Sequence, residues 1–353
     1  MKRIGIYIAT VVCILSCIPP QRNLLTETRQ MLVDSGATER TAALFYNLRQ
    51  LTGKQVVYGQ HNYEMDGFDS DTTRWRDEAN RCDAYDVTGT YPALASFDFL
   101  HFTNPHSWET KDPDYIRQKF HAAYNRGNVI TFCWHYYNPV TGGNFYDTTR
   151  VVRHILPGGS HHAIFKADLK IIADFAHNAK ADNGELIPII FRPWHEFDGN
   201  WFWWGRNHCR VEEFKELYRF TVTYLRDSLQ VHNFLYAFFP DCGFTTEAEY
   251  LERYPGDEYV DVVGMDNYWE FRPDGGDTSL VVLKARILTQ YARQHAKLSA
   301  ITETGTQTRD SLWYTQLLSI LRSEGVALNY VCSWSGFAPY KGHPAATDFC
   351  RFK

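Results

Sequence analysis

Short apolar runs alternate with stretches of helical spacing along most of this chain. From about residue 37 onward there are eight such runs, and several are continuously apolar in their first half. This pattern is typical of β-strands that are buried on both faces. The runs are Val56–His61, Ala93–Phe99, Val129–His135, Pro188–Glu196, Phe234–Pro240, Val260–Tyr268, Ser299–Gly305 and Tyr330–Gly336.

The stretches between the runs repeat apolar residues every three or four positions, which predicts helices with one apolar face. Gly127 and Gly325 follow two of these helices, as helix-ending glycines often do. The apolar positions are Ile116, Phe120, Ala123 and Tyr124 in one stretch, Ile164, Ala167, Ile171 and Phe175 in a second, and Phe214, Leu217, Tyr218, Thr221, Tyr224 and Leu225 in a third.

Eight strands that alternate with helices predict an α/β fold, a single (β/α)8 TIM barrel. An open, doubly wound sheet is the alternative, but no GxGxxG motif follows the first run. No linker and no change of composition interrupts residues 37–353, so we assign this range to one barrel domain.

The barrel also predicts where chemistry should occur, because active sites of this fold lie at the C-terminal ends of the strands. Those ends are the polar and aromatic-rich places of this sequence. They are Gly59-Gln60-His61, Asp98, Trp134-His135-Tyr136, Trp194-His195-Glu196, Asp241, Asp266-Asn267-Tyr268-Trp269, Glu303 and Trp334-Ser335.

Two glutamates occupy these ends: Glu196 closes the fourth run and Glu303 lies in the seventh. Strands four and seven lie on opposite sides of a barrel mouth, so their carboxylates can face each other across a bound sugar. Retaining glycoside hydrolysis needs two carboxyl groups about 5–5.5 Å apart, one as acid and base and one as nucleophile. For either glutamate alone, a salt-bridged carboxylate at a strand end is the alternative interpretation; the pair favours a glycosidase.

The surroundings should separate the pKa values of the two carboxyls, because the acid must keep its proton while the nucleophile stays ionised. Aromatic residues near Glu196 are candidates for an apolar wall that raises the pKa of the acid. Tyr268 is the candidate phenol that would keep Glu303 ionised. The candidate wall consists of Phe191, Trp194, Phe197 and Trp201.

Trp201, Trp203 and Trp204 follow Glu196 closely. In a loop after strand four they would lie at the catalytic face, where indole rings stack on the flat C–H faces of sugars. We expect at least one of the three to belong to the core, because three such close neighbours cannot all face one groove.

Metal and serine chemistry have little support in the sequence. The zinc motif HExxH that His195-Glu196 would begin requires a second His where the chain has Gly199. No GxSxG motif supports a serine hydrolase. We therefore predict an enzyme that needs no metal and no cofactor.

Composition narrows the classes of partner. The 353 residues carry a net charge of −5, which gives no support for a basic nucleic-acid face or a polybasic membrane patch. Aromatic residues make up 16% of the chain, which suits a large core and a groove that stacks on ligand rings.

The N-terminus has the pattern of an export signal. Two basic residues precede the apolar run Ile4–Leu15, which is too short for a membrane helix but fits a secretory signal. A small residue directly before Cys17 resembles the bacterial lipobox, in which the cysteine is lipidated. We predict a signal peptide at residues 1–16, a tether at residues 17–36 and a lipid anchor in the cell envelope; an ordinary cleaved signal and a secreted protein are the alternative.

The six cysteines of the barrel region form no CxxC pair, so the sequence does not indicate a structural zinc site. Cys133 and Cys332 lie inside strand-like runs, where we expect buried free thiols. In an exported protein some of the six could pair, and the sequence leaves the connectivity open.

The segment Arg192–Gly205, which reads RPWHEFDGNWFWWG, closely resembles glycoside hydrolase family 26, the β-mannanase family of a barrel clan that keeps its two glutamates on strands four and seven. Further matches are Gly264–Trp269, Thr302–Gly305 and Trp334–Gly336, and the resemblance extends from about Thr38 onward.

The resemblance implies that Glu196 is the general acid/base and Glu303 the nucleophile. Ser335 stands where some endo-acting members have Arg, which leaves the endo or exo pattern open. The residues that the resemblance implies for substrate binding are His195 before the acid/base, Trp201 near the scissile bond, Tyr268 beside the nucleophile, and His135 and Trp334 around the −1 sugar.

The leading hypothesis is a retaining endo-β-1,4-mannanase that acts on mannan, glucomannan or galactomannan. Exo release of mannobiose, β-1,3-xylanase and mixed-linkage glucanase activity are alternatives within the same family. A non-catalytic glycan-binding lipoprotein is the rival from another class, and a binder would have no need of an acid and nucleophile pair.

Overall fold

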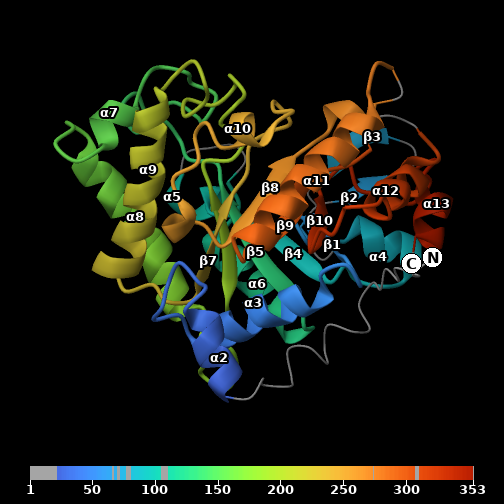
Figure 1. The fold of residues 1–353 in the computed structure, drawn as a ribbon, viewed down its shortest axis with the longest axis horizontal. Coiled ribbons are helices and arrows are strands. Elements are labelled where there is room, and N and C mark those ends of the chain that lie inside the picture. Colours follow the sequence, from blue (N-terminus) through green and yellow to red (C-terminus); the bar gives the residue numbers. More distant parts are fainter. Residues whose placement is uncertain are drawn as a thin grey trace.

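Eight parallel strands close into a barrel in the order β1-β10-β9-β8-β7-β6-β5-β4, with helices packed around it (Figure 1). The computed structural model describes residues 22–65, 67–69, 72–76, 81–104, 110–272, 274–306 and 310–352. The predicted (β/α)8 barrel is confirmed, and it arises because each buried strand is followed by a segment that folds back over the outside of the sheet.

Each predicted run overlaps one barrel strand, but most strands end before their run does. The fourth strand ends at Pro193, so Glu196 lies in the turn that follows it. The strands are β1 (Val57–His61), β4 (Leu94–Asp98), β5 (Val129–Trp134), β6 (Ile189–Pro193), β7 (Phe234–Phe238), β8 (Val262–Asp266), β9 (Leu298–Thr304) and β10 (Tyr330–Ser333).

The helices surround this barrel, and α9 continues into a π-helical turn at Tyr224–Ser228. A short antiparallel hairpin of β2 (Gly67–Asp69) and β3 (Thr72–Arg76) follows β1; the sequence patterns did not predict it. The helices are α2 (Arg22–Arg29), α3 (Glu39–Leu51), α4 (Asp83–Thr88), α5 (Leu100–Thr103), α6 (Pro113–Asn125), α7 (Val152–Ile155), α8 (His162–Asn178), α9 (Val211–Thr223), α10 (Glu247–Tyr250), α11 (Thr278–Gln294), α12 (Trp313–Leu321) and α13 (Ala346–Arg351).

The three predicted helices correspond to α6, α8 and α9, but three of the four apolar positions assigned to α8 were wrong; the fourth, Phe175, is buried as predicted. Ile164, Ala167 and Ile171 are exposed. The true buried stripe lies one position further along the helix and has the same helical spacing, so a spacing pattern alone did not distinguish the two. The stripe consists of Phe165, Leu169, Ile172, Ala173 and Ala176.

The predicted tether, residues 17–36, is partly folded. α2 contacts α3, and Leu25 and Leu32 are buried in the same apolar cluster as the inner face of α3. The folded region therefore begins before residue 37, because these leucines help to close the N-terminal end of the barrel. The predicted signal peptide at residues 1–16 and the predicted lipidation site Cys17 lie outside the described residues.

The cysteines of the barrel region are free thiols. Cys133 and Cys332 are buried, as predicted, and none of the six cysteines within the described ranges is in a disulfide. Among the helices that the structure describes, none is long and apolar enough to cross a membrane.

The barrel interior changes from apolar to polar along the strands. Leu94 on β4 and Ile190 on β6 share an apolar cluster with Phe45 of α3, which closes the N-terminal end (Figure 1). Because side chains alternate between the two faces of a strand, Asp98 and Arg192 point to the same interior, nearer the C-terminal end. The chain thus places a charged layer directly above an apolar one.

Candidate active site

Glu196 lies in a tight turn after β6 that holds two non-glycine residues in the left-handed region, Trp194 at φ 58° and Glu196 at φ 52°. Such backbone is uncommon outside glycine and is found where the surroundings enforce it, often at functional sites. The backbone N–H of Glu196 donates to the carbonyl of Phe239 at 2.9 Å, and the buried indole of Trp194 donates to Thr221 at 3.1 Å. These contacts fix the direction of the Glu196 side chain.

The carboxyl of Glu196 is built to hold a proton. Burial raises its pKa well above the usual range, and the charges of Glu303, Asp266 and Asp241 add to the rise. The indole N–H of Trp201 donates to Oε2 of Glu196 at 2.6 Å and acts in the opposite direction. At neutral pH this side chain is therefore suited to donate a proton.

Glu303 lies near the end of β9 and has different partners. Its Oε1 accepts a hydrogen bond from the guanidinium of Arg192, and its Oε2 accepts one from the phenol of Tyr268 at 3.1 Å. The Glu303 side chain is only 7% exposed. These two donors fix the orientation of the Glu303 carboxylate, the kind of group that a retaining glycosidase uses as its nucleophile.

Arg192 connects two buried carboxylates. One nitrogen contacts Glu303, and the other donates to Oδ2 of Asp266, at the end of β8, at 2.9 Å. The hydroxyl of Thr302 donates to Oδ1 of the same Asp266 at 2.5 Å. Burial is the main cause that raises the pKa of Asp266, and Arg192 opposes this rise. The guanidinium is the positive charge in direct contact with both acids.

One carboxylate oxygen from each of Glu196, Asp266 and Glu303 lies within 4.8 Å of the others. The separation between Glu196 and Glu303 therefore fits the roughly 5–5.5 Å of a retaining glycosidase and is too short for the roughly 6.5–9.5 Å of an inverting one. Three oxygens this close could also ligate a hard cation. In this arrangement Arg192 already supplies a positive charge to two of the three acids.

Three histidines, at or just after the C-terminal ends of β1, β5 and β6, lie beside these acids. His61, at the end of β1, stacks on Trp334 with ring centroids 3.7 Å apart and an angle of 9°. His135 follows β5, and its Nε2 lies 3.1 Å from Nε2 of His195, which is itself 4.0 Å from Glu303. The half-buried Trp334 thus lies on the same side of the barrel as both glutamates.

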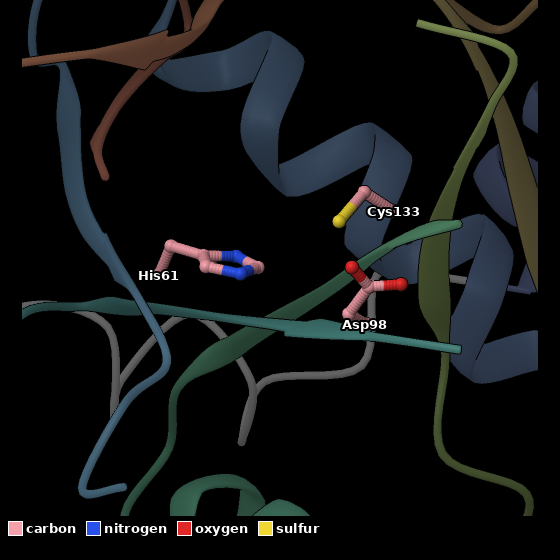
Figure 2. Close-up of side chains that lie close together, drawn as sticks. All are labelled: His61, Asp98 and Cys133. Carbon is pink, nitrogen blue, oxygen red and sulfur yellow. The ribbon is translucent and has the colours of Figure 1, made fainter. Parts of the chain in front are cut away.

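Figure 2 shows His61, Asp98 and Cys133 pointing toward one another from three neighbouring strands, and their ligand atoms lie within 4.8 Å of one another. An imidazole, a thiolate and a carboxylate are ligands that zinc accepts. Both oxygens of Asp98 already accept hydrogen bonds, however, from His135 and from the backbone of Leu100. A metal at this place would have to displace those donors.

The structure brings the predicted site residues together: Glu196, Glu303 and the five predicted sugar-binding residues all lie at the C-terminal end of the barrel strands. The tryptophan prediction is also met, since Trp203 and Trp204 are fully buried and only Trp201 is partly exposed. Trp203 and Trp204 donate their indole N–H groups to backbone carbonyls of Tyr136 and His195 and so anchor the loop.

The predicted aromatic wall is smaller than expected. Trp201 contacts Glu196 directly. Phe191, Trp194 and Phe197 instead pack among other core rings, for example Phe197 against Phe238 with centroids 4.7 Å apart. The raised pKa of Glu196 therefore comes from burial together with neighbouring carboxylates more than from an aromatic enclosure.

Sequence reasoning missed Arg192 and Asp266 as parts of the site and Asp98 as a partner of His135. The sequence did contain an indication for Arg192, because it is the charged residue inside the otherwise apolar run Pro188–Trp194. A charge in a buried strand must be paired. Asp98 and Asp266 were noted as strand-end residues, but strand ends alone did not reveal which groups they would contact.

Replacing Trp201 with phenylalanine should move the alkaline limb of kcat/KM to higher pH. The indole N–H favours the ionised form of Glu196, so its removal raises the pKa of this acid further and keeps it protonated to higher pH. A pH profile on a manno-oligosaccharide, the substrate class that the sequence resemblance implies, measures the shift. A substrate with an activated leaving group needs no protonation and should show no such shift; a limb that moves to lower pH would contradict the assignment.

The sequence profile of glycosyl hydrolase family 26 matches residues 33–337. A mannan endo-1,4-β-mannosidase from Bifidobacterium adolescentis is 34% identical over 352 residues, which cover 90% of this chain and 34% of the relative. The chain thus spans about a third of the length of that curated relative.

Two solved structures are similar over nearly the whole chain. GH26C from a Muricauda species is 36% identical, covers 93% of both chains and has a TM-score of 0.85. A family 26 β-mannanase from Bacteroides ovatus is 36% identical, with 88% of this chain and 92% of that chain covered and a TM-score of 0.80. With the family profile covering most of its length and its carboxylates meeting at the mouth of an eight-stranded barrel, this chain belongs to glycosyl hydrolase family 26.

Proposed function

We propose that the protein is a retaining endo-β-1,4-mannanase that cleaves internal bonds of mannan, glucomannan or galactomannan. The observation that carries the proposal is the close approach of Glu196 and Glu303 in contrasting surroundings. The names of the relatives support the choice of substrate, since the Bifidobacterium protein is a mannan endo-1,4-β-mannosidase and the Bacteroides structure is a β-mannanase.

In the first step, Glu303 attacks the anomeric carbon while Glu196 gives its proton to the departing glycosidic oxygen. A covalent glycosyl-enzyme forms, and the aglycone leaves. In the second step, Glu196, now ionised, takes a proton from water, which attacks the anomeric carbon and releases Glu303. Two inversions give net retention of configuration.

The surroundings of each acid suit its step. Burial and nearby negative charge keep Glu196 protonated before attack, and the loss of charge on Glu303 during attack favours release of that proton. Arg192 and Tyr268 hold the Glu303 carboxylate in place for an in-line approach. Attack by Glu303 and proton transfer from Glu196 therefore favour each other electrostatically.

The sugar-binding roles are proposed for groups around the two acids. Trp201 and Trp334 offer partly exposed indole faces for stacking, and His135, His195 and Tyr268 offer polar atoms beside the acids. A pyranose between the acids would meet apolar faces along its ring and hydrogen-bonding groups at its rim, which is the usual design of a sugar site.

The experiment that tests the proposal is digestion of linear mannan, galactomannan, β-1,3-xylan and mixed-linkage glucan side by side, with products sized over time. We expect mannan to be cleaved fastest, into a range of oligosaccharides from the start. A dimer as the sole early product would indicate exo action. Proton NMR of the first product should show the β-anomer, and an initial α-anomer would rule out retention.

We also propose that the protein is exported and lipid-anchored through Cys17, on the support of the apolar run Ile4–Leu15 and the small residue before the cysteine. Expression in a bacterial host with intact lipoprotein processing should then yield a membrane-associated protein with an acylated N-terminal peptide by mass spectrometry. Cys17→Ser should abolish acylation, while Cys13→Ser serves as the matched control. Acylation that persists in Cys17→Ser would contradict the proposal.

A further inference from the structure

Two imidazoles face each other across a gap that admits one proton. Nε2 of His135 and Nε2 of His195 are 3.1 Å apart, and both rings are buried. A ring nitrogen either donates or accepts, so a hydrogen bond at this distance requires one nitrogen to carry a proton and the other to be bare. The question is which of the two rings donates.

Asp98 determines which nitrogen of His135 carries a proton. Its Oδ2 lies 2.6 Å from Nδ1 of His135, and its Oδ1 accepts backbone N–H groups from His135 at 3.1 Å and Leu100 at 2.8 Å. Although burial acts to raise it, the pKa of Asp98 is held well below the usual range by His135. An ionised carboxylate can only accept, so Nδ1 of His135 carries a proton wherever Asp98 is ionised and this hydrogen bond is present.

The charge state of His135 then decides which of the two rings donates the hydrogen bond. When His135 is positively charged, its Nε2–H donates and His195 offers a lone pair. When His135 is neutral, its Nε2 is bare and His195 must donate. Burial lowers the pKa of His135, but Asp98 outweighs this and raises it overall, whereas burial and the charge of His135 hold the pKa of His195 well below its usual value. His195 is therefore neutral in both states and changes only its tautomer.

We propose that Asp98 is a positioning residue: by holding the Nδ1 proton of His135, it sets which imidazole donates in the His135–His195 hydrogen bond, and so whether Nε2 of His195, near Glu303, carries a proton. Nε2 of His195 lies 4.0 Å from Oε1 of Glu303. The importance of this for catalysis rests on the proposed function, in which Glu303 is the nucleophile.

Going from the charged to the neutral pair, the proton in the gap passes from His135 to Nε2 of His195, and one proton leaves Nδ1 of His195 for solvent. That nitrogen is buried and has no hydrogen-bond partner among the described residues, which is consistent with a site that changes between donor and bare lone pair. Asp98 keeps its charge throughout.

The groups that face His135 come from five strands and the turn after one of them. Asp98 and His195 are within hydrogen-bond distance of the ring, and Cys133 Sγ lies 3.8 Å from Nδ1; burial raises the pKa of this thiol so that it stays neutral. The other charged or titratable neighbours are more remote and of both signs. The full set is His61 on β1, Asp98 on β4, Cys133 on β5, Arg192 on β6 and His195 after it, and Glu303 on β9.

The test replaces Asp98 with asparagine, which keeps the shape and an acceptor for Leu100 but removes the charge. In protein labelled with ¹⁵N at histidine, His135 should titrate at lower pH than in the wild type. The rate of glycosylation measured with an aryl β-mannobioside carrying an activated leaving group should fall about 10–100-fold, as for other groups that orient a functional imidazole. Its pH profile should have an inflection that moves down together with the NMR titration. Cys133→Ser, beside the same ring but without a change of charge, should leave both unchanged.

A His135 titration unaltered by Asp98→Asn would overturn the proposal, as would an NMR shift with no accompanying kinetic shift. Should the variant not fold, the wild type decides alone: His195 must exchange Nδ1–H for Nε2–H over the same pH range in which His135 loses its charge, and a fixed His195 tautomer refutes the idea. Because the NMR measurement needs no substrate, a protein that cleaves no mannan but shows the exchange supports the proton arrangement and contradicts only the proposed function.

Discussion

Replacing Glu303 with alanine should lower kcat on linear mannan by at least about 10⁴-fold, the range expected when a covalent nucleophile is removed. The variant loses the atom that bonds to the anomeric carbon. Asp266, the other carboxylate in contact with Arg192, is held by hydrogen bonds from Arg192 and Thr302 and is not expected to take its place. Reducing-sugar release and single-turnover trapping of the glycosyl-enzyme measure the loss. Glu303→Gln, which keeps the shape, should be as inactive and shows that the charge is what is required.

Glu196→Ala is the matched control, since it removes the other carboxylate of the pair. It should lose most activity on mannan but retain glycosylation of a substrate with an activated leaving group, where no acid is needed. Added azide should then release a β-mannosyl azide, because the small anion replaces the water that Glu196 would activate. Similar losses for both variants on the activated substrate would contradict the assignment of roles.

The barrel was predictable because its signal is repeated eight times. A strand such as β5 (Val129–Trp134) is apolar on both faces, and a short run of that kind followed by a helical stretch has few other solutions in a chain of this length. The placement of Glu196 and Glu303 followed from the same argument, since it needs only the identity of the strands that precede them.

What escaped prediction depends on details that spacing does not encode. The buried face of α8 is one residue away from the predicted one, because both stripes have helical periodicity and only packing decides between them. α2 was taken for a tether because the stretch from Pro19 to Asn23 is typical of a linker, yet Leu25 and Thr28 of this helix are buried. Tertiary contacts settled both cases.

The site's electrostatics were the least predictable part, and they connect the fold to the chemistry. The barrel interior has a charged layer above an apolar one, so each charge buried there needs a polar or charged partner. Arg192 contacts both Asp266 and Glu303, and Nδ1 of His135 lies in hydrogen-bond contact with Asp98. The residues that hold the nucleophile are thus also the ones that make a buried charged layer tolerable.

Replacing Arg192 with methionine should therefore cost both stability and activity. Methionine fills much of the volume, but two buried carboxylates lose their shared partner, and breaking a buried ion pair in this way typically costs about 3–5 kcal/mol. Unfolding in urea measures the loss. It should shrink as the pH falls, because the pKa of Asp266 is already raised by burial and would rise further without Arg192, so that its protonated form needs no counter-charge.

Asp266→Asn provides the decisive control for this interpretation. As a single substitution, Asp266→Asn should destabilise the protein modestly, since it leaves Arg192 paired with Glu303 alone. Added to Arg192→Met, it should recover part of the lost stability, because one fewer uncompensated charge remains in the interior, and residues in one network are not additive. The double variant should stay inactive, since Glu303 still has no cation to orient it. If the two losses simply added, the buried carboxylates would not share Arg192 energetically, and the charged layer would have to be stabilised in another way.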